Sequence, residues 1–407
     1  MVTDSFSARH GTVEASTFSS EAQRKVPTNN ARSSLRRREA VGNTDAPASF
    51  GAGIFSFLLQ CITMTARYAT KDEIVNWNTH ILANPDGGNV FSSFEYAKQK
   101  KLTGYRTRYV FVGQTAITVL EKETPPFGRL WYLPKGPNVT STKELFSILE
   151  KIRPLAKRKM VFAIRVESEL PRTSQKTLER HGLRKAAPII PNPSTITLDI
   201  SKPLDEVLTS LPQKGRHAIR RAERDGVTVN AVKTTEKNCR TMYKLLKDTS
   251  EGQFGIRSYN YYKTFWQRFE ASKHGQLFFA YYDGKPVAGA YAMTFGEKST
   301  YKDGASARKR TAYGASHLLQ WKVIEWAKSR GATIHDFCGS PPSDEIRNPE
   351  HPHYGIGLFK TSFNKEVTDY VGCYDLVVSR PAYFGWTAIG ERLYRRAYYK
   401  RTKDYYY

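Results

Sequence analysis

The stretch that decides the fold runs from Leu277 to Tyr301 and reads LFFAYYDGKPVAGAYAMTFGEKSTY. Three runs rich in aromatic and aliphatic residues follow one another here, at 277–282, 286–295 and 298–301, and each is typical of a β-strand. A predicted helix at 312–330 and a predicted strand at 334–338 come next. Strands and helices in this order indicate a mixed α/β unit.

The same alternation extends toward the N-terminus and breaks once, at the proline-rich residues 188–193. After the break we predict a strand at 194–199 and helices at 204–225, 239–251 and 259–271. Before it we predict strands at 108–120, 129–133 and 160–166, and helices at 143–157 and 173–181. The fold class is therefore α/β (α+β), with two successive units and the second beginning near residue 198.

The length, composition and net charge of the chain limit the classes of protein and partner that it fits. The chain has 407 residues, which is more than one typical domain, and its 40% hydrophobic and 25% charged residues are those of a soluble globular protein. No window approaches the roughly 20 apolar residues that a membrane span needs. A formal net charge of +25 points to a polyanionic partner such as nucleic acid, a phosphorylated substrate or an anionic membrane face.

The first 50 residues or so lack aliphatic periodicity and are rich in Ser, Thr, Ala, Asn and Arg, which predicts disorder. The apolar run Ala52–Met64 that follows has two interpretations, a signal anchor or an extension that precedes a functional start at Met64. Both stay open on the sequence.

Motifs for metals, cofactors and nucleophiles are missing. The cysteines at 61, 239, 338 and 373 form no C-x-x-C pair, so we expect neither a zinc site nor a disulfide framework, and a reducing cytoplasm as the compartment. There is no H-E-x-x-H, no phosphate-binding G-x-x-x-x-G-K-[ST] and no G-x-S-x-G. We therefore expect no metal and no cofactor.

The densest basic stretch is Gln213–Gly226, QKGRHAIRRAERDG. Arg216, Arg220 and Arg224 recur at four-residue spacing and so share one face of a helix. This face is either a solvated surface or a ridge that follows the phosphates of a nucleic acid. The C-terminal residues 392–405 repeat the pattern, with arginines and lysines between tyrosines that can stack on bases or pack a helix.

A second candidate lies after the Gly- and Pro-rich residues 339–357, which we expect to form a long loop with Gly355 and Gly357 as hinges. Phe359 and Lys360 follow directly. A lysine between aromatic residues at the end of a loop is placed to stabilise negative charge at a site entrance, although a plain surface lysine explains the same pattern.

Several segments together resemble the FemABX family, the aminoacyl-tRNA-dependent transferases that build the peptide cross-bridges of bacterial peptidoglycan. The resemblance spans about residues 70–378. Its segments are GNVFSSFEYAKQK (88–100), YLPKGP (132–137), residues 211–229, RSYNY (257–261), YKDGAS (301–306), residues 316–326 and FKTSFNKEV (359–367).

The resemblance implies two tandem GNAT-like acyltransferase domains without an inserted coiled-coil arm. Applied to this chain, residues 1–66 are an extension, 67–197 form the first domain, completed by about 372–407, and 198–371 form the second. The implied donor is aminoacyl-tRNA, and the implied acceptor is a muropeptide linked to uridine diphosphate or to undecaprenyl phosphates. The expected location is the cytoplasm, with peripheral contact with the inner membrane face left open.

Residue by residue, the resemblance places Lys100 and Arg257 at the positions that hold the acceptor's phosphates, with Tyr261 at a neighbouring contact. An ammonium and a guanidinium suit a diphosphate. Phe359 and Lys360 match the pair at the aminoacyl end of the donor, where Lys360 would stabilise the oxyanion.

The chain also departs from the family pattern at four positions. Glu167 stands where a related Asp contacts the acceptor, and Asp303 falls where a Tyr can do so; Phe162 replaces a Tyr and Tyr96 replaces a Trp. Glu167 and Asp303 are also our candidates for a general base, and the substrate itself is a third.

Two other functions remain alternatives. One is N-acylation with an acyl-coenzyme-A donor, but the place for a pyrophosphate-binding turn, Ala307–Ser316, has one glycine where two or three are wanted. The other is a nucleic-acid-binding protein without catalysis, for which the basic helix and tail suffice.

Overall fold

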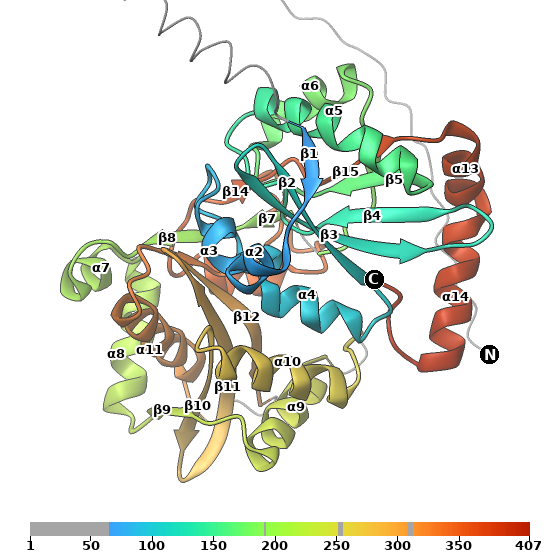
Figure 1. The fold of residues 1–407 in the computed structure, drawn as a ribbon. Coiled ribbons are helices and arrows are strands. Elements are labelled where there is room, and N and C mark those ends of the chain that lie inside the picture. Colours follow the sequence, from blue (N-terminus) through green and yellow to red (C-terminus); the bar gives the residue numbers. More distant parts are fainter. Residues whose placement is uncertain (1–64, 191–192, 251–254, 308–311) are drawn as a thin grey trace, which may run out of the picture. The chain divides into compact units, whose positions relative to one another are not determined.

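The structure is a computed structural model that describes residues 65–190, 193–250, 255–307 and 312–407 (Figure 1). The disordered start and the apolar run predicted within 1–64 lie outside the described residues. The first described strand begins at Ala66.

A seven-stranded sheet holds the first series of strands in the order β1-β2-β3-β4-β5-β15-β6. The strands are β1 (Ala66–Tyr68), β2 (Arg106–Val112), β3 (Thr115–Glu123), β4 (Arg129–Leu133), β5 (Val161–Val166), β15 (Cys373–Val377) and β6 (Arg184–Ala186). Only β4 and β5 pair in parallel, and all other neighbours are antiparallel. The sheet thus takes one strand, β15, from near the C-terminus.

A six-stranded sheet holds the second series in the order β8-β13-β12-β11-β10-β9. Its strands are β8 (Thr197–Asp199), β13 (Ile334–Asp336), β12 (Lys298–Ser306), β11 (Lys285–Phe295), β10 (Gly275–Tyr282) and β9 (Thr228–Val232). Again a single pair, β12 and β13, is parallel. A separate short pair joins β7 (Ser194–Thr195) to β14 (Thr368–Asp369).

Helices flank both sheets. Around the first sheet lie α2 (Lys71–Val75), α3 (Trp77–Leu82), η1 (Val90–Ser92), α4 (Phe94–Lys101), α5 (Thr142–Arg158), η2 (Arg172–Ser174), α6 (Gln175–Arg180), α13 (Arg380–Gly385), η3 (Trp386–Gly390) and α14 (Glu391–Thr402). Around the second lie α7 (Leu204–Ser210), α8 (Gln213–Arg224), α9 (Glu236–Ser250), α10 (Tyr259–Ala271), α11 (Ala315–Ser329) and α12 (Tyr354–Lys360).

The two sheets repeat one plan. In each, an antiparallel meander (β2-β3-β4 and β10-β11-β12) leads through one helix (α5 and α11) to a strand that pairs in parallel with the last meander strand. The connecting helix lies against its own sheet (Figure 1). The longest helix among the described residues is α5, with 17 residues, so no coiled-coil arm occurs there.

Three sequence predictions of elements are wrong in detail. The run 108–120 is a hairpin, because Gly113 adopts φ 59° and turns β2 into β3. The helix predicted at 204–225 is two helices, because Leu211 precedes Pro212 and takes an extended conformation (ψ 149°). The loop predicted at 339–357 ends early, because α12 begins at Tyr354.

One hydrophobic cluster joins the two sheets. The first sheet and its helices contribute Trp77, Tyr96 and Tyr105, and the second contributes Trp266 and Tyr291, all at most 5% exposed. The sheets also make contact through α4 and α10. Aromatic burial on this scale makes the seam between the sheets a rigid place for a site.

Candidate active site at the seam between the sheets

Helix α4 brings Lys100 to the seam. The Ser93 hydroxyl caps the helix by accepting a hydrogen bond from the Tyr96 amide at 3.2 Å. Tyr96 and Ala97 are buried, and Lys100, three residues after Ala97, lies on the same buried side with an exposure of 2%. A lysine so deeply buried is rare unless it has a function or a partner.

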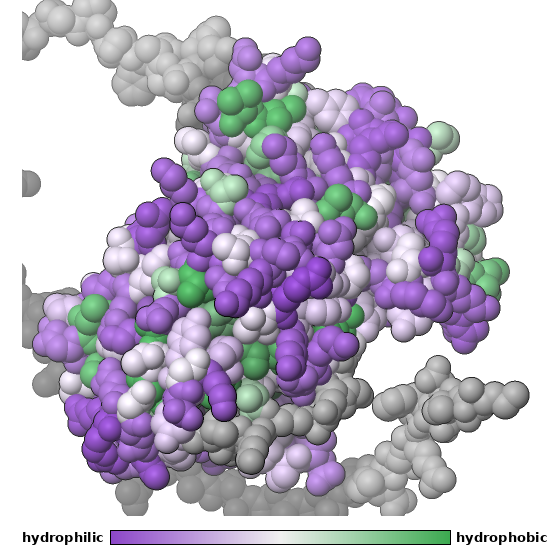
Figure 2. Space-filling view, turned by 90° about the horizontal axis from the view of Figure 1, so that it is seen from below, coloured by the Kyte–Doolittle hydropathy of each residue, from purple (hydrophilic) through white to green (hydrophobic). Residues whose placement is uncertain are grey.

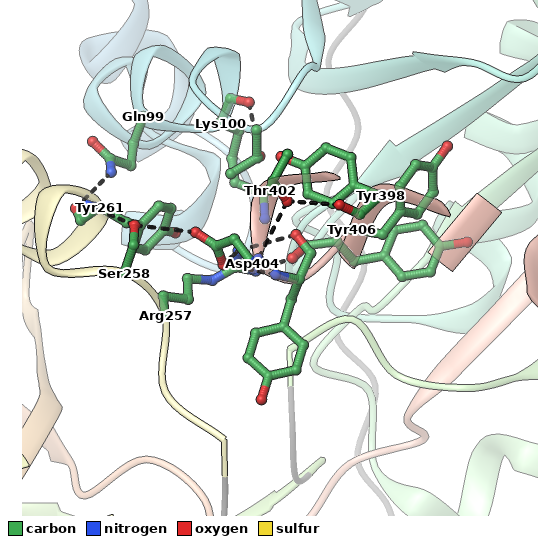
Figure 3. Close-up of polar contacts among 12 residues, drawn as sticks. Gln99, Lys100, Arg257, Ser258, Tyr261, Tyr398, Thr402, Asp404 and Tyr406 are labelled. Carbon is green, nitrogen blue, oxygen red and sulfur yellow. Dashed lines mark hydrogen bonds and ion pairs between the residues drawn. The ribbon is translucent and has the colours of Figure 1, made fainter. Parts of the chain in front are cut away.

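Helix α10 places Arg257 and Tyr261 opposite Lys100. Ser258 caps this helix, and Arg257 directly precedes the cap, with its guanidinium 4.6 Å from the centre of the Tyr261 ring. The Gln99 side-chain amide donates to the Tyr261 carbonyl at 3.0 Å and so ties α4 to α10 (Figure 3). The structure thus brings Lys100 together with Arg257 and Tyr261, although Lys100 lies about 160 residues before them in the sequence.

Strand β3 adds Lys122, a cation that the sequence reasoning missed. Lys122 is 4% exposed, and its Nζ lies 4.4 Å from the centre of the Tyr105 ring. Lys100 Nζ lies 5.2 Å from the same ring. Nothing in the local sequence marks Lys122, because it lies in a polar run, LEKETPP, at the end of a strand.

These cations repel one another in a place with little water. Burial, followed by the charges of Arg257 and Lys122, holds the pKa of Lys100 well below its usual range. Burial and Arg257 lower the pKa of Lys122 to about 7. Buried cations with depressed pKa values favour an anionic ligand, because an anion restores their protonated form.

Residues near the C-terminal end of the chain contact these cations. Asp404 forms an ion pair with Arg257 at 3.1 Å and accepts a hydrogen bond from the Ser258 hydroxyl at 3.3 Å (Figure 3). Arg257 also donates to the backbone oxygen of Tyr405 at 3.3 Å and to that of Tyr407.

Lys122 has a partner in the same segment. It donates to the backbone oxygen of Tyr406, whose ring centre lies 3.5 Å from the Nζ atom. The segment Asp404–Tyr407, here called the C-terminal segment, therefore supplies a carboxylate and carbonyl oxygens to the cations.

Glu167 follows β5 and is 6% exposed. One carboxylate oxygen accepts a hydrogen bond from the Tyr132 hydroxyl, and the other accepts from the amides of Ile189 and Ile190 at 2.6 and 3.2 Å. The carboxylate lies close enough to Lys100 to act on its pKa. It is nevertheless fully engaged, which weakens its candidacy as a general base.

Asp303 lies on β12 beside a β-bulge. Tyr291 pairs with Asp303 and Ala292 pairs with Tyr301, so Lys302 is the extra residue. One Asp303 oxygen accepts from the Trp266 indole at 2.9 Å and the other from Lys302 Nζ at 2.9 Å. Asp303 is therefore also engaged, and Lys302 is a further cation that sequence reasoning did not find.

Lys360 ends α12 and is 6% exposed, so it is not a surface lysine. Its ammonium donates to the carbonyls of Cys338 and Gly339, in the segment that follows β13. Burial lowers the pKa of Lys360 to about 8. Two of its three N–H donors are thus used, and the group stays protonated at neutral pH.

Phe359 packs beside Lys360 in the core of the second sheet, with its ring 5.0 Å from the His317 ring of α11. The predicted glycine hinge is wrong. Gly355 and Gly357 lie inside α12, and a Cβ atom on Gly357 would approach Ile346 Cδ1 to 2.9 Å. Gly357 therefore serves close packing.

The basic helix α8 packs on α11, and its buried residues are Gly215, Ala218, Ile219 and Ala222. Arg220 and Arg224 are exposed, but Arg216 donates to the carbonyls of Thr209 and Leu211 and joins α8 to α7. A Cβ atom on Gly215 would lie 2.0 Å from the Ser362 carbonyl oxygen, so α8 starts against the residues that follow Lys360.

Apart from the three arginines of α8, the predicted site residues therefore form two groups. Lys100, Arg257 and Tyr261 lie together at the seam, with Glu167 and Asp303 nearby. Phe359 and Lys360 lie at the end of β13, next to the start of α8. Lys302 lowers the pKa of both Lys100 and Cys338 through its charge.

Comparison with known proteins shows which families and enzymes this chain is similar to. A family described as an acetyltransferase (GNAT) domain matches residues 213–345, from the start of α8 to just beyond β13. The lipid II:glycine glycyltransferase of Staphylococcus aureus strain MRSA252 is 23% identical over 391 residues, covering 74% of this chain and 91% of the relative. The enzyme of strain USA300 is equally similar, at 23% over 384 residues.

A crystal structure of FemX superimposes with a TM-score of 0.68 at 20% identity, covering 80% of this chain and 99% of that one. The chain thus shares the fold of FemX and is similar in sequence to the lipid II:glycine glycyltransferases, and both findings support the FemABX family. This confirms the resemblance noted in the sequence. It also confirms the prediction of tandem GNAT-like units without a coiled-coil arm, which the repeated strand plan of the two sheets displays.

Proposed function

We propose that this protein is an aminoacyltransferase of the FemABX type, which moves an amino acid from aminoacyl-tRNA to the side-chain amine of a peptidoglycan-precursor stem peptide. The cluster of two buried lysines, Lys100 and Lys122, with the partly buried Arg257 is the observation that carries the proposal, because an acceptor linked to a diphosphate supplies the anion that these residues need. The relatives named as lipid II:glycine glycyltransferases support an acceptor of this class.

The acceptor's phosphates would take the place that the C-terminal segment holds in this structure. Asp404 contributes one carboxylate to Arg257, whereas a diphosphate brings more charge and more acceptor oxygens. Binding would then require the segment to leave Arg257 and Lys122.

The reaction joins two substrates with little covalent help from the protein. The acceptor amine attacks the ester carbonyl, the new C–N bond forms, and the ester C–O bond breaks. The amine proton passes to the departing ribose oxygen, because the carboxylates of Glu167 and Asp303 are already hydrogen-bonded. Positioning and charge stabilisation supply most of the rate.

Lys360 is our candidate for stabilising the oxyanion of the tetrahedral intermediate. Its carbonyl partners at 338 and 339 fix the ammonium, which retains one N–H donor for the substrate. The basic helix α8 begins next to this lysine and would hold the tRNA phosphates through Arg220 and Arg224, so that the acylated end reaches Lys360.

A second candidate is N-acylation from an acyl-coenzyme A, which the match of residues 213–345 to the acetyltransferase (GNAT) family favours. The turn before α11 argues against it. Its one glycine, Gly314, approaches the Ala218 carbonyl so closely that a Cβ atom would lie 2.2 Å away. That glycine therefore serves helix packing.

A donor test separates these functions. The muropeptide acceptor is incubated with charged tRNA, with acetyl-coenzyme A, or without donor, and the product mass is measured. The proposal expects an added aminoacyl mass with charged tRNA alone. An added acetyl mass would favour the second candidate, and no product with any donor, despite tRNA binding, would favour a nucleic-acid-binding protein without catalysis.

A further inference from the structure

The outward side of α13, η3 and α14 is an exposed surface that the proposed reaction does not use. Phe384, Ile389 and Leu393 are 75%, 59% and 58% exposed and occupy successive turns. Figure 2 shows apolar surface at the edge on the side of α13 and α14, bordered by hydrophilic surface. Large exposed apolar side chains that gather in one place usually mark an interaction site.

The inward side of these helices explains why the apolar residues face out. Trp386 is fully buried, and Gly385 and Gly390 approach the Phe127 ring so closely that Cβ atoms there would lie 2.9 and 2.6 Å away. This packing fixes the rotation of the helices. Phe384, Ile389 and Leu393 therefore cannot turn inward.

Basic residues surround the apolar ones. The exposed cations are Arg380, Arg392, Arg395, Arg396, Lys400, Arg401 and Lys403. The one acidic residue of α13, η3 and α14, Glu391, faces inward and lies 3.7 Å from Arg165. Within the part of the chain that the structure describes, no carboxylate forms an ion pair with Arg392, Arg395 or Arg396.

A groove of about 920 Å³ opens beside Phe384. Its cationic lining residues are Arg153, Arg184, Lys185 and Arg380, from α5, β6 and α13. Its one carboxylate, Glu179, already accepts a hydrogen bond from the Tyr374 hydroxyl at 3.2 Å. The groove thus offers an anionic headgroup a place next to an exposed aromatic ring.

We propose that the outward side of α13, η3 and α14 docks on an anionic phospholipid bilayer. Phe384, Ile389 and Leu393 enter the boundary between headgroups and acyl chains, while the arginines and lysines contact the phosphates. A nucleic acid would contact the cations but gives no role to the exposed side chains of Phe384, Ile389 and Leu393, whereas an anionic bilayer accounts for both sets of residues. No described helix is both long and apolar enough to span a bilayer.

The test is co-sedimentation of the full chain with phosphatidylcholine vesicles and with vesicles containing phosphatidylglycerol. Neither donor nor acceptor is present, so the outcome does not depend on the proposed reaction. Phe384→Ser/Leu393→Ser removes apolar surface without changing charge. Its matched control is Val75→Ser/Leu102→Ser, at side chains 79% and 54% exposed on α2 and just after α4.

We expect several-fold more binding to the anionic vesicles and at least a fivefold loss with Phe384→Ser/Leu393→Ser, whereas the control pair binds like the parent. Equal binding by the parent, the variant and the control would overturn the proposal. Thermal unfolding of each variant checks that it is folded.

A charge variant decides the matter even if the apolar variant folds poorly. Arg392→Gln/Arg395→Gln/Arg396→Gln should reduce vesicle binding at least fivefold, whereas Lys237→Gln/Lys244→Gln/Lys247→Gln on α9 should reduce it less than twofold. The same α14 variant should bind tRNA like the parent. Loss of tRNA binding with vesicle binding intact would assign this surface to nucleic acid instead.

Discussion

At the scale of single residues, the burial of Lys360 strengthens the proposed interaction between its ammonium and an oxyanion. Its carbonyl contacts hold a charge where solvent is largely excluded, and there an oxyanion interaction is worth several kcal/mol, about 2.7–4 in measured cases. We therefore expect Lys360→Met to reduce single-turnover transfer by about a hundredfold or more and to leave muropeptide affinity near that of the parent. The exposed Lys365→Met is the control.

The same prediction has a pH dependence. The pKa of Lys360 is lowered to about 8, so the ammonium loses its proton as pH rises through 8. The rate advantage of the parent over Lys360→Met should therefore shrink above pH 8. Equal rates for the two proteins at pH 7 would remove Lys360 from the mechanism.

Lys122 predicts a proton linkage. With a pKa near 7 it is mostly neutral at pH 8, and a bound diphosphate should raise that pKa and protonate it. Acceptor binding at pH 8 should therefore take up protons, which calorimetry detects as a binding enthalpy that depends on the ionisation enthalpy of the buffer. Lys122→Arg should reduce this proton uptake, because a guanidinium stays charged, whereas Lys100 still contributes to it. Identical enthalpies in two such buffers would contradict the prediction.

The residue scale also shows what sequence can and cannot predict. Lys100, Arg257 and Tyr261 followed from matched family segments, and the structure brings them together. Lys122 and the C-terminal segment did not, because their contacts join residues more than 130 positions apart. No local pattern encodes such pairing.

At the scale of elements, α8 carries a prediction for tRNA. Each phosphate contact that is lost should reduce the slope of log affinity against log salt by about 1. Arg220→Gln/Arg224→Gln should therefore flatten that slope, whereas Lys237→Gln/Lys244→Gln on α9 should not. A filter-binding titration at several salt concentrations measures this slope. An unchanged slope would mean that the basic face of α8 is a solvated surface that does not contact tRNA.

Arg216 shares this face of α8, but its bonds to the α7 carbonyls give it a structural part. Charged hydrogen bonds of this kind contribute about 1.5–3 kcal/mol. The structure thus divides a group of three arginines that spacing alone treats as equal. Similarly, helix periodicity did not reveal the break between α7 and α8, although Pro212 marks it.

The contact between the C-terminal segment and Arg257 leads us to predict that one substitution increases the affinity for the acceptor. If the acceptor's phosphates replace Asp404 at Arg257, then Asp404→Asn should raise acceptor affinity about threefold to tenfold, since a competing ion pair is lost. Asp205→Asn, an exposed acid at the start of α7, is the control. Acceptor affinity that falls in Asp404→Asn would mean that the segment helps to build the site.

At the scale of the whole molecule, the order of strands and helices was enough to predict two α/β units. The run Leu277–Tyr301 became most of β10, all of β11 and the first four of the nine residues of β12, and α10 spans the predicted 259–271. The seam was not predictable from patterns, because its aromatic cluster draws on both sheets and its members carry no shared periodicity. The candidate site lies at that seam.

The central claim is that the seam cations bind the phosphates of the acceptor, and calorimetry with a uridine-diphosphate-linked muropeptide tests it most directly. We predict that Lys100→Ala and Arg257→Ala each lose about 1.5–3 kcal/mol of binding free energy while tRNA affinity stays unchanged. Lys101→Ala, the exposed neighbour on α4, should bind like the parent. Parent-like acceptor affinity in both Lys100→Ala and Arg257→Ala would contradict the account.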